Sequence, residues 1–158
     1  MNHHQGRPDH ELTMTVLMTP DMANFSGNDH GGTILKFLDS VAYACASRYS
    51  GSYVVTLSVD QVMFLEPIHV GELVTFLASV NYTGTSSMEV GIRVVTENIA
   101  QRTQRYANSC YFTMVAVDAN RKPQAVPPLV PETDDQKRRC AKAEERKRSR
   151  QALHGKQR

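Results

Sequence analysis

The chain has 158 residues, of which 41% are hydrophobic, so it suits one compact domain with a real core and is not intrinsically disordered. No apolar run approaches the ~20 residues that span a bilayer, and the polar start of the chain lacks the apolar segment of a secretion signal. The net charge is +2, but residues 132–158 alone carry ten Lys/Arg against five Asp/Glu. Basic charge therefore lies on the tail rather than the body, which disfavours a nucleic-acid-binding domain, and no membrane partner is expected.

Three cysteines, Cys45, Cys110 and Cys140, form no CxxC pair and leave an odd number. This pattern disfavours both a disulfide framework and a zinc site, and a reducing cytoplasm is the simplest location. Cys45 and Cys110 fall on apolar faces, so we expect them to be buried hydrophobic residues.

The first third of the chain predicts a strand, a loop and one long helix. Residues 1–10 are expected to be disordered. Residues 12–18 alternate between apolar and polar side chains, which predicts a strand that ends at Thr19-Pro20-Asp21. A loop with three glycines, residues 24–32, leads into a helical periodicity over residues 33–48. The apolar arc of this helix comprises Ile34, Leu35, Phe37, Leu38, Val41, Ala42 and Cys45.

Four further strands are predicted after the helix, at residues 53–65, 73–82, 88–97 and 106–117. The first of them is rich in β-branched residues and apolar on one face, at Val55, Leu57, Val59 and Met63.

The remaining residues predict an extended segment and a second helix. Residues 119–131 contain four prolines and form an extended exit segment. The basic tail, residues 132–158, reads as an exposed helix, because Thr133 and Gln136 have capping-box spacing and no apolar stripe follows them.

One long helix and about five antiparallel strands predict an α+β fold. A single helix cannot cover both faces of a sheet, so the economical arrangement is a central helix wrapped by a curved sheet, the hotdog fold, over residues 11–118. A lone helix also predicts self-association, because apolar surface remains to be buried.

The segment from Asn24 to Asp39 is the candidate catalytic region. His30-Gly31-Gly32 lies at the predicted helix start, where backbone N–H groups and the helix dipole stabilise negative charge. An oxyanion on a carbonyl would suit this place. For the glycines alone, an ordinary turn before a helix is at least as good an interpretation.

Asp39 lies at the edge of the apolar arc of the helix, between Leu35 and Ala42. A carboxylate in that position is expected to be partly desolvated, which would make it a better base. Taken alone, such an aspartate is more often structural, and it gains significance from the glycine loop that precedes it.

The run Asn24-x-x-Gly27-Asn28-x-His30-Gly31-Gly32, followed by Asp39, resembles the cytosolic acyl-CoA thioester hydrolases of the hotdog superfamily, the group that includes brown-fat-inducible thioesterase. The resemblance covers about residues 10–128. It continues through Val54-Val55-Thr56, Phe64-Leu65-Glu66-Pro67, Gly71-Glu72, residues 83–87 and Val115-Ala116-Val117-Asp118. One departure is Asp29, which stands where the family usually has an apolar residue.

The resemblance implies roles for the catalytic residues. Asp39 would activate water or attack the thioester, Asn24 would reach the site from a partner subunit, and the N–H groups of Gly31 and Gly32 would hold the oxyanion. Thr56 would orient the carboxylate or the water, although a lone threonine is more often only a strand residue.

The resemblance also implies where the substrate binds and how the chain assembles. The expected substrate-binding residues are His30 and the hairpin residues Gly84, Thr85, Ser86 and Ser87. No direct catalytic role is expected for the His30 side chain. The family forms dimers of two hotdogs that assemble into trimers of dimers.

The leading hypothesis is therefore hydrolysis of fatty acyl-CoA to free CoA and a carboxylic acid. The reaction needs no metal or redox cofactor, and coenzyme A enters only as part of the substrate and product. Two alternatives stay open. One is a hotdog dehydratase of acyl thioesters, which would use His30 with Asp39. The other is a non-catalytic sensor of acyl-CoA or nucleotides.

Overall fold

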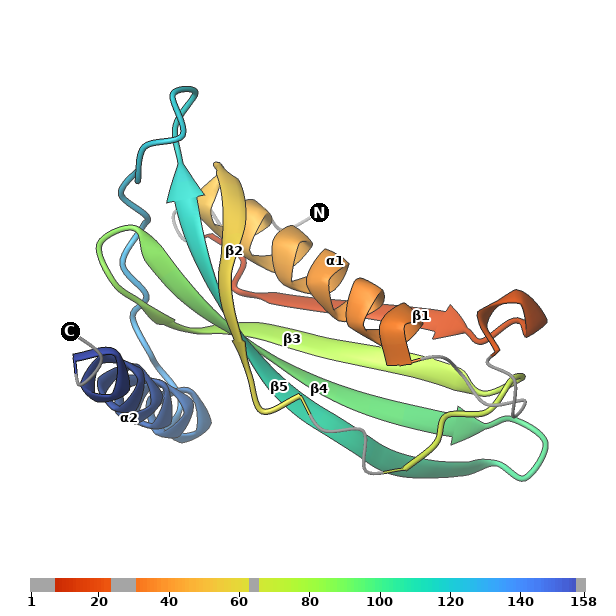
Figure 1. Ribbon diagram of the computed structural model, residues 1–158. Coiled ribbons are helices and arrows are strands. Elements are labelled where there is room, and N and C mark those ends of the chain that lie inside the picture. Colours follow the sequence, from red (N-terminus) through yellow and green to blue (C-terminus); the bar gives the residue numbers. More distant parts are fainter. Residues whose placement is uncertain (1–7, 24–30, 63–65, 156–158) are drawn as a thin grey trace, which may run out of the picture.

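The computed structural model describes residues 8–23, 31–62 and 66–155. Two long helices and five strands make up this part of the chain (Figure 1). Their bounds are β1 Glu11–Leu17, α1 Gly31–Ser50, β2 Tyr53–Asp60, β3 Leu73–Thr83, β4 Ser87–Asn98, β5 Thr103–Val117 and α2 Asp134–Gly155, with a short 3-10 helix at Pro20–Met22.

The five strands form one antiparallel sheet in the order β1-β3-β4-β5-β2. The sheet curves around α1, which crosses its concave face, while α2 lies on the opposite face (Figure 1). This arrangement confirms the predicted hotdog fold with a C-terminal helix. The strands and α1 begin and end within a few residues of their predicted positions, except for β2.

The core lies between α1 and the concave face of the sheet. It includes Leu38 and Val41 from α1 and Phe76, Val90 and Phe112 from the strands, all almost fully covered. Burying such side chains contributes roughly 1.5–3 kcal/mol each. Cys45 and Cys110 belong to this core, as predicted, and burial raises the pKa of each thiol to about 12.

Strand β2 differs from its prediction in length and in the face that it buries. It ends at Asp60 because Gln61 adopts a left-handed backbone conformation with φ of 61°. Met63 lies outside the described residues. The buried residue of the strand is Val54, whereas three residues of the predicted apolar face are exposed: Val55, Leu57 and Val59. The physical reason is that β2 is an edge strand with a bulge in it.

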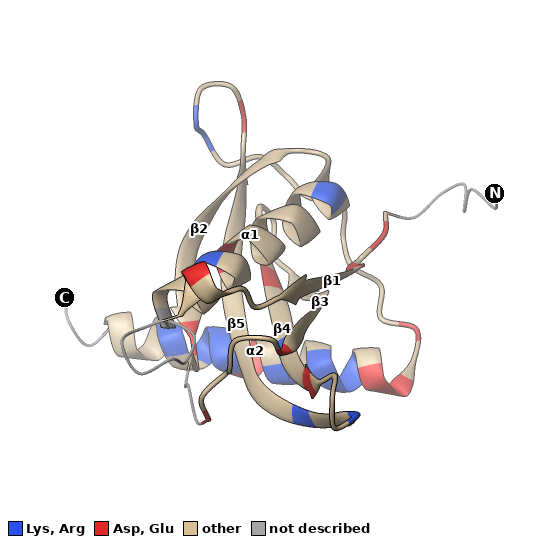
Figure 2. Cartoon of the chain, turned by 90° about the vertical axis from the view of Figure 1, so that its right-hand side faces the viewer, with Lys and Arg blue, Asp and Glu red and all other residues tan. Residues whose placement is uncertain are grey.

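Helix α2 begins with the predicted capping box, since the amide of Gln136 donates to Thr133 Oγ1 and the amide of Thr133 donates to Gln136 Oε1. Most of the helix is exposed, and Figure 2 shows Lys and Arg gathered along it. One side nevertheless rests on the outer face of the sheet, where Ala143 is buried. No helix in the described part of the chain has the length and hydropathy needed to cross a membrane.

Candidate active site

Asp39 and Thr56 are hydrogen-bonded to each other, although they are seventeen positions apart. Thr56 Oγ1 donates to Asp39 Oδ1 at 2.9 Å, which joins the middle of α1 to the edge strand β2. The same hydroxyl lies 3.5 Å from the Met114 sulfur, on the neighbouring strand β5. A threonine hydroxyl has a single proton, and the carboxylate is the stronger acceptor, so the hydroxyl orients one carboxylate oxygen and leaves the other available.

Both members of this pair are exposed in the single chain. The expected partial desolvation of Asp39 is therefore wrong for one chain on its own. The reason lies in its neighbours: Ala42 is fully buried, but Leu35, one turn before Asp39, is itself exposed. The described residues of a single chain therefore leave the Asp39 carboxylate open to solvent.

Gly31 and Gly32 form the first two positions of α1, whereas the predicted helix began at residue 33, directly after them. Asn24 and His30 lie outside the described residues. Gly32 precedes Asp39 by seven residues, which corresponds to about 10 Å along a helix axis. The start of α1 and the carboxylate of the same chain are therefore too far apart to act on one carbonyl.

The hairpin between β3 and β4 holds the other candidate substrate-binding residues. Its backbone is fixed by three bonds: the Gly84 amide to the Ser87 carbonyl, the Ala116 amide to the Ser86 carbonyl, and the Val126 amide to the Thr85 carbonyl. A Cβ at Gly84 would lie 2.7 Å from Ser87 Oγ, so a side chain there requires a rearrangement.

This hairpin lies beside the row of residues that contains Thr56. Thr56 pairs with Met114, which pairs in turn with Met88 on β4, and Ser87 is the next residue along that strand. The hairpin and the hydrogen-bonded pair are thus separated by about two strand spacings, roughly 10 Å.

An exposed apolar surface adjoins the Asp39–Thr56 pair. Leu57 is 70% exposed on the free edge of the sheet. Tyr53, on the same strand, packs its ring against Tyr43 of α1 at 6.0 Å between centroids. This surface, called the apolar edge below, comprises Leu35, Tyr43, Tyr53, Val55, Leu57 and Val59. An edge strand with exposed apolar side chains is a typical site for association with another chain.

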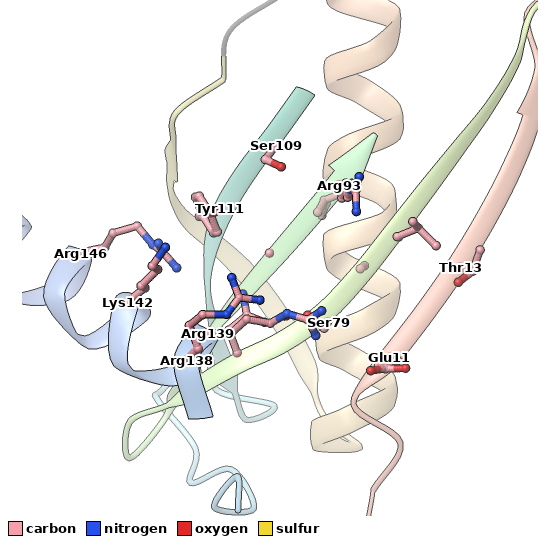
Figure 3. Close-up of a pocket in the computed structure, with 15 residues that line it drawn as sticks. Glu11, Thr13, Ser79, Arg93, Ser109, Tyr111, Arg138, Arg139, Lys142 and Arg146 are labelled. Atoms are coloured by element: carbon pink, nitrogen blue, oxygen red, sulfur yellow. Dashed lines mark hydrogen bonds between the residues drawn. The ribbon is translucent and has the colours of Figure 1, made fainter. Parts of the chain in front are cut away.

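A basic groove lies on the other face of the sheet, beneath α2 (Figure 3). Its volume is about 450 Å³, and its floor is formed by β3, β4 and β5. Arg139 and Lys142 of α2 reach over it, and Arg93 rises from β4 (Figure 3). Because Thr56 faces α1, the groove and the Asp39–Thr56 pair of one chain lie on opposite faces. Among the described residues, no group of three or more His, Cys, Asp or Glu side chains could hold a metal ion.

Two charged residues of the sheet have partners that the sequence did not predict. Glu89 is 3% exposed and makes two hydrogen bonds with Arg146, at 2.6 and 3.1 Å. Asp60 accepts a bond from Arg150 at 2.5 Å. An acidic residue within an apolar strand is the only sequence signal for these contacts, and it does not identify the partner.

Several known proteins are similar to the chain. A family model described as the thioesterase superfamily matches residues 26–102. Protein VdlD of Helicobacter pylori is 51% identical over 140 residues, which cover 89% of this chain and 80% of VdlD. The uncharacterized acyl-CoA thioester hydrolase YkhA of Bacillus subtilis is 34% identical over 149 residues, or 87% of each chain. The cytosolic acyl coenzyme A thioester hydrolase of Mus musculus is 36% identical over 82% of this chain, which spans 34% of the mouse protein.

The chain is also similar to solved structures of acyl-CoA thioesterases and hydrolases. A hexameric acyl-CoA thioesterase matches with a TM-score of 0.87 at 34% identity, covering 91% of this chain and 92% of that one. The acyl-CoA hydrolase of Staphylococcus aureus, in complex with butyryl coenzyme A, coenzyme A and coenzyme A disulfide, matches with a TM-score of 0.84 at 34% identity, covering 93% and 91%. Three further structures of the staphylococcal enzyme are alanine variants of an asparagine, an aspartate 15 positions later and a threonine 17 positions after that.

Proposed function

Because the chain belongs to the thioesterase superfamily, among its acyl-CoA thioester hydrolases, we propose that it hydrolyses fatty acyl-CoA with Asp39 as the central carboxylate. The observation that carries this assignment is the bond from Thr56 to Asp39. Asn24, Asp39 and Thr56 also have the same spacing, 15 and 17 positions, as the three residues replaced in the staphylococcal variants.

The proposed reaction joins an oxygen atom to the acyl carbon and releases the thiol. As a general base, Asp39 takes a proton from water while the water oxygen attacks the thioester carbonyl. The oxyanion that forms is held by the N–H groups of Gly31 and Gly32. When this intermediate collapses, the C–S bond breaks and the CoA thiolate takes up the proton. Asp39 acting as the nucleophile would instead form an acyl anhydride, which water then hydrolyses.

The site is proposed to be shared between two chains. Asp39 is exposed, lies about two turns of helix from Gly32 and adjoins the apolar edge. A second copy at this edge would cover the carboxylate and supply Asn24, Gly31 and Gly32. Hexameric relatives support a trimer of such dimers, and the cytosolic mouse relative supports a cytoplasmic location.

Mixing two inactive variants tests whether the site is shared. Asp39→Ala and Asn24→Ala should each hydrolyse acyl-CoA poorly, and their mixed dimers should regain one intact site of two. After joint unfolding and refolding of equal amounts, random pairing predicts about a quarter of wild-type activity, because half the dimers are mixed. The assay is thiol release with refolded single variants as controls. If activity is not regained although mixed dimers have formed, then Asp39 and Asn24 of one active site come from the same chain.

Thr56→Val is expected to lower kcat about tenfold with little change in KM. The valine keeps the shape of the side chain but removes the proton donated to Asp39, and a hydrogen bond to a charged group contributes about 1.5–3 kcal/mol. Thr56→Ser keeps the donor and serves as the matched control. A serine variant as slow as the valine variant would argue against this role.

Product analysis separates hydrolysis from the two alternatives. Incubation with acyl-CoA of several chain lengths should release free thiol and carboxylic acid. A dehydratase would instead convert a β-hydroxyacyl-CoA to the enoyl-CoA without releasing thiol. A sensor would bind acyl-CoA in calorimetry and release nothing.

A further inference from the structure

Within a few residues, side chains of strand β2 make hydrogen bonds on both faces of the sheet. Thr56 points inward and donates to Asp39 of α1, whereas Asp60 points outward and accepts from Arg150 of α2. Residues four apart in a regular strand face the same side of the sheet. The opposite directions of Thr56 and Asp60 therefore require one extra residue between them.

The extra residue is Leu57. On β5, Met114 and Thr113 are adjacent, but their partners on β2 are Thr56 and Ser58, so Leu57 has no partner. The bulge reverses the alternation after this point. Consistent with the reversal, Asp60 pairs with Tyr111, whose ring faces α2 on the outer side.

The outer contact of β2 is well enclosed. The side chains of Arg150 and Asp60 are 21% and 28% exposed, and their closest atoms are 2.5 Å apart. Beside them, the Arg146 guanidinium lies 3.6 Å from the centroid of the Tyr111 ring and also bonds to Glu89. Burial acts to lower the pKa of Arg146, but the bond to Glu89 and the charges around it prevail and raise that pKa. The Arg146 guanidinium is therefore firmly charged.

The inner contact of β2 depends on how the bulge is held. Among the described residues of one chain, β2 pairs only with β5, so within that chain its other edge makes no ladder bonds that could hold the bulge in place. The strand path after Leu57 is fixed by the ladder to β5 and by the contact between Asp60 and Arg150. A small change in that path would turn the Thr56 hydroxyl away from Asp39, because a hydrogen bond weakens steeply with angle.

We propose that Arg150 is a positioning residue for the Asp39–Thr56 pair, acting through Asp60 and the bulge at Leu57. Helix α2 thereby helps to set the geometry of a site on the opposite face of the sheet. This inference rests on the proposed function only in taking Asp39 as the working carboxylate.

Arg150→Ala tests the inference by kinetics and by amide hydrogen exchange. We expect kcat to fall roughly fivefold with KM unchanged, because a misdirected catalytic group affects the reacting step. Exchange at the amides of residues 56–60, measured without substrate, should become at least tenfold faster. Arg150→Lys should restore much of the kcat and much of the protection from exchange. Arg138→Ala is the matched control, since Arg138 pairs only with Asp135 of its own helix among the contacts of the described residues.

A double variant identifies the route of the effect. In a Thr56→Val background, Arg150→Ala should lower kcat no further, because the hydroxyl that it positions is already absent. A full fivefold loss in that background, or unchanged exchange at residues 56–60, would overturn the proposal. Undiminished hydrolysis by Asp39→Ala would refute the proposed function instead, and the exchange result would still report on the link from α2 to β2.

Discussion

Replacing Asp39 with asparagine is expected to lower kcat for acyl-CoA hydrolysis by about a thousandfold or more. The change preserves the size of the side chain and its ability to accept from Thr56, but removes the negative charge that acts on water or on the thioester. General-base catalysis alone contributes typically 10²–10⁴-fold. KM should change much less, because the carboxylate acts mainly in the transition state. Thiol release under saturating acyl-CoA measures both constants.

Stability measurements separate this loss from unfolding. Asp39 is exposed and bonds only to Thr56 among the described residues, so the melting temperature of Asp39→Asn should stay within a few degrees of wild type. Asp135→Asn makes the same chemical change at an exposed carboxylate of α2 and should hydrolyse at the normal rate. An Asp39→Asn variant that keeps more than a tenth of wild-type kcat would remove Asp39 from the centre of the mechanism.

The sequence predicted the fold because its two periodicities are separated along the chain. Helical spacing of apolar residues is confined to the stretch that became α1, and strand alternation lies on both sides of it, so one core helix and one antiparallel sheet were the economical interpretation. The seventeen-residue spacing from Asp39 to Thr56 was recognised only through a family resemblance. The structure adds the hydrogen bond between these two side chains, which hydrophobic periodicity does not predict.

The exposure of the apolar residues of β2 has a physical origin that the sequence does not contain. Alternating apolar residues indicate burial but do not say whether the covering surface comes from the same chain or from another. Val55, Leu57 and Val59 were predicted to form one apolar face, and all three are exposed on the edge strand. The exposure of Asp39 fits the same explanation, because the proposed shared site has a second chain cover this carboxylate.

The charged contacts of α2 were unpredictable for a different reason. Glu89 alternates with apolar residues on β4, a pattern typical of a solvent-facing position, and the basic tail reads as a solvated helix. Only the tertiary structure brings Arg146 onto Glu89 and Arg150 onto Asp60. Ion pairs between segments that are distant in the sequence leave no repeating pattern from which they could be predicted.

Replacing Leu57 with arginine is expected to break the dimer contact at the apolar edge, which lowers the mass of the assembly, and to lower hydrolysis at least a hundredfold at micromolar protein concentration. Leu57 is the most exposed of the large apolar side chains, at 70%, and it lies in the middle of the apolar edge. Placing a charge in a buried contact typically costs 2–4 kcal/mol or more, and a twofold axis brings the same residue in twice. Light scattering measures the mass, and thiol release measures the activity of the same samples.

Two further variants separate loss of association from local damage to the bulge. Tyr53→Arg changes the apolar edge away from Leu57 and should give the same fall in mass with the same loss of activity. Leu153→Arg places the charge on α2 at a side chain that is 67% exposed, and should leave mass and activity unchanged. If Leu57→Arg kept the wild-type mass while Leu153→Arg dissociated, the chains would associate through α2, and a site shared across β2 would be ruled out. Mass and activity falling together for both β2 variants is the result that a shared site requires.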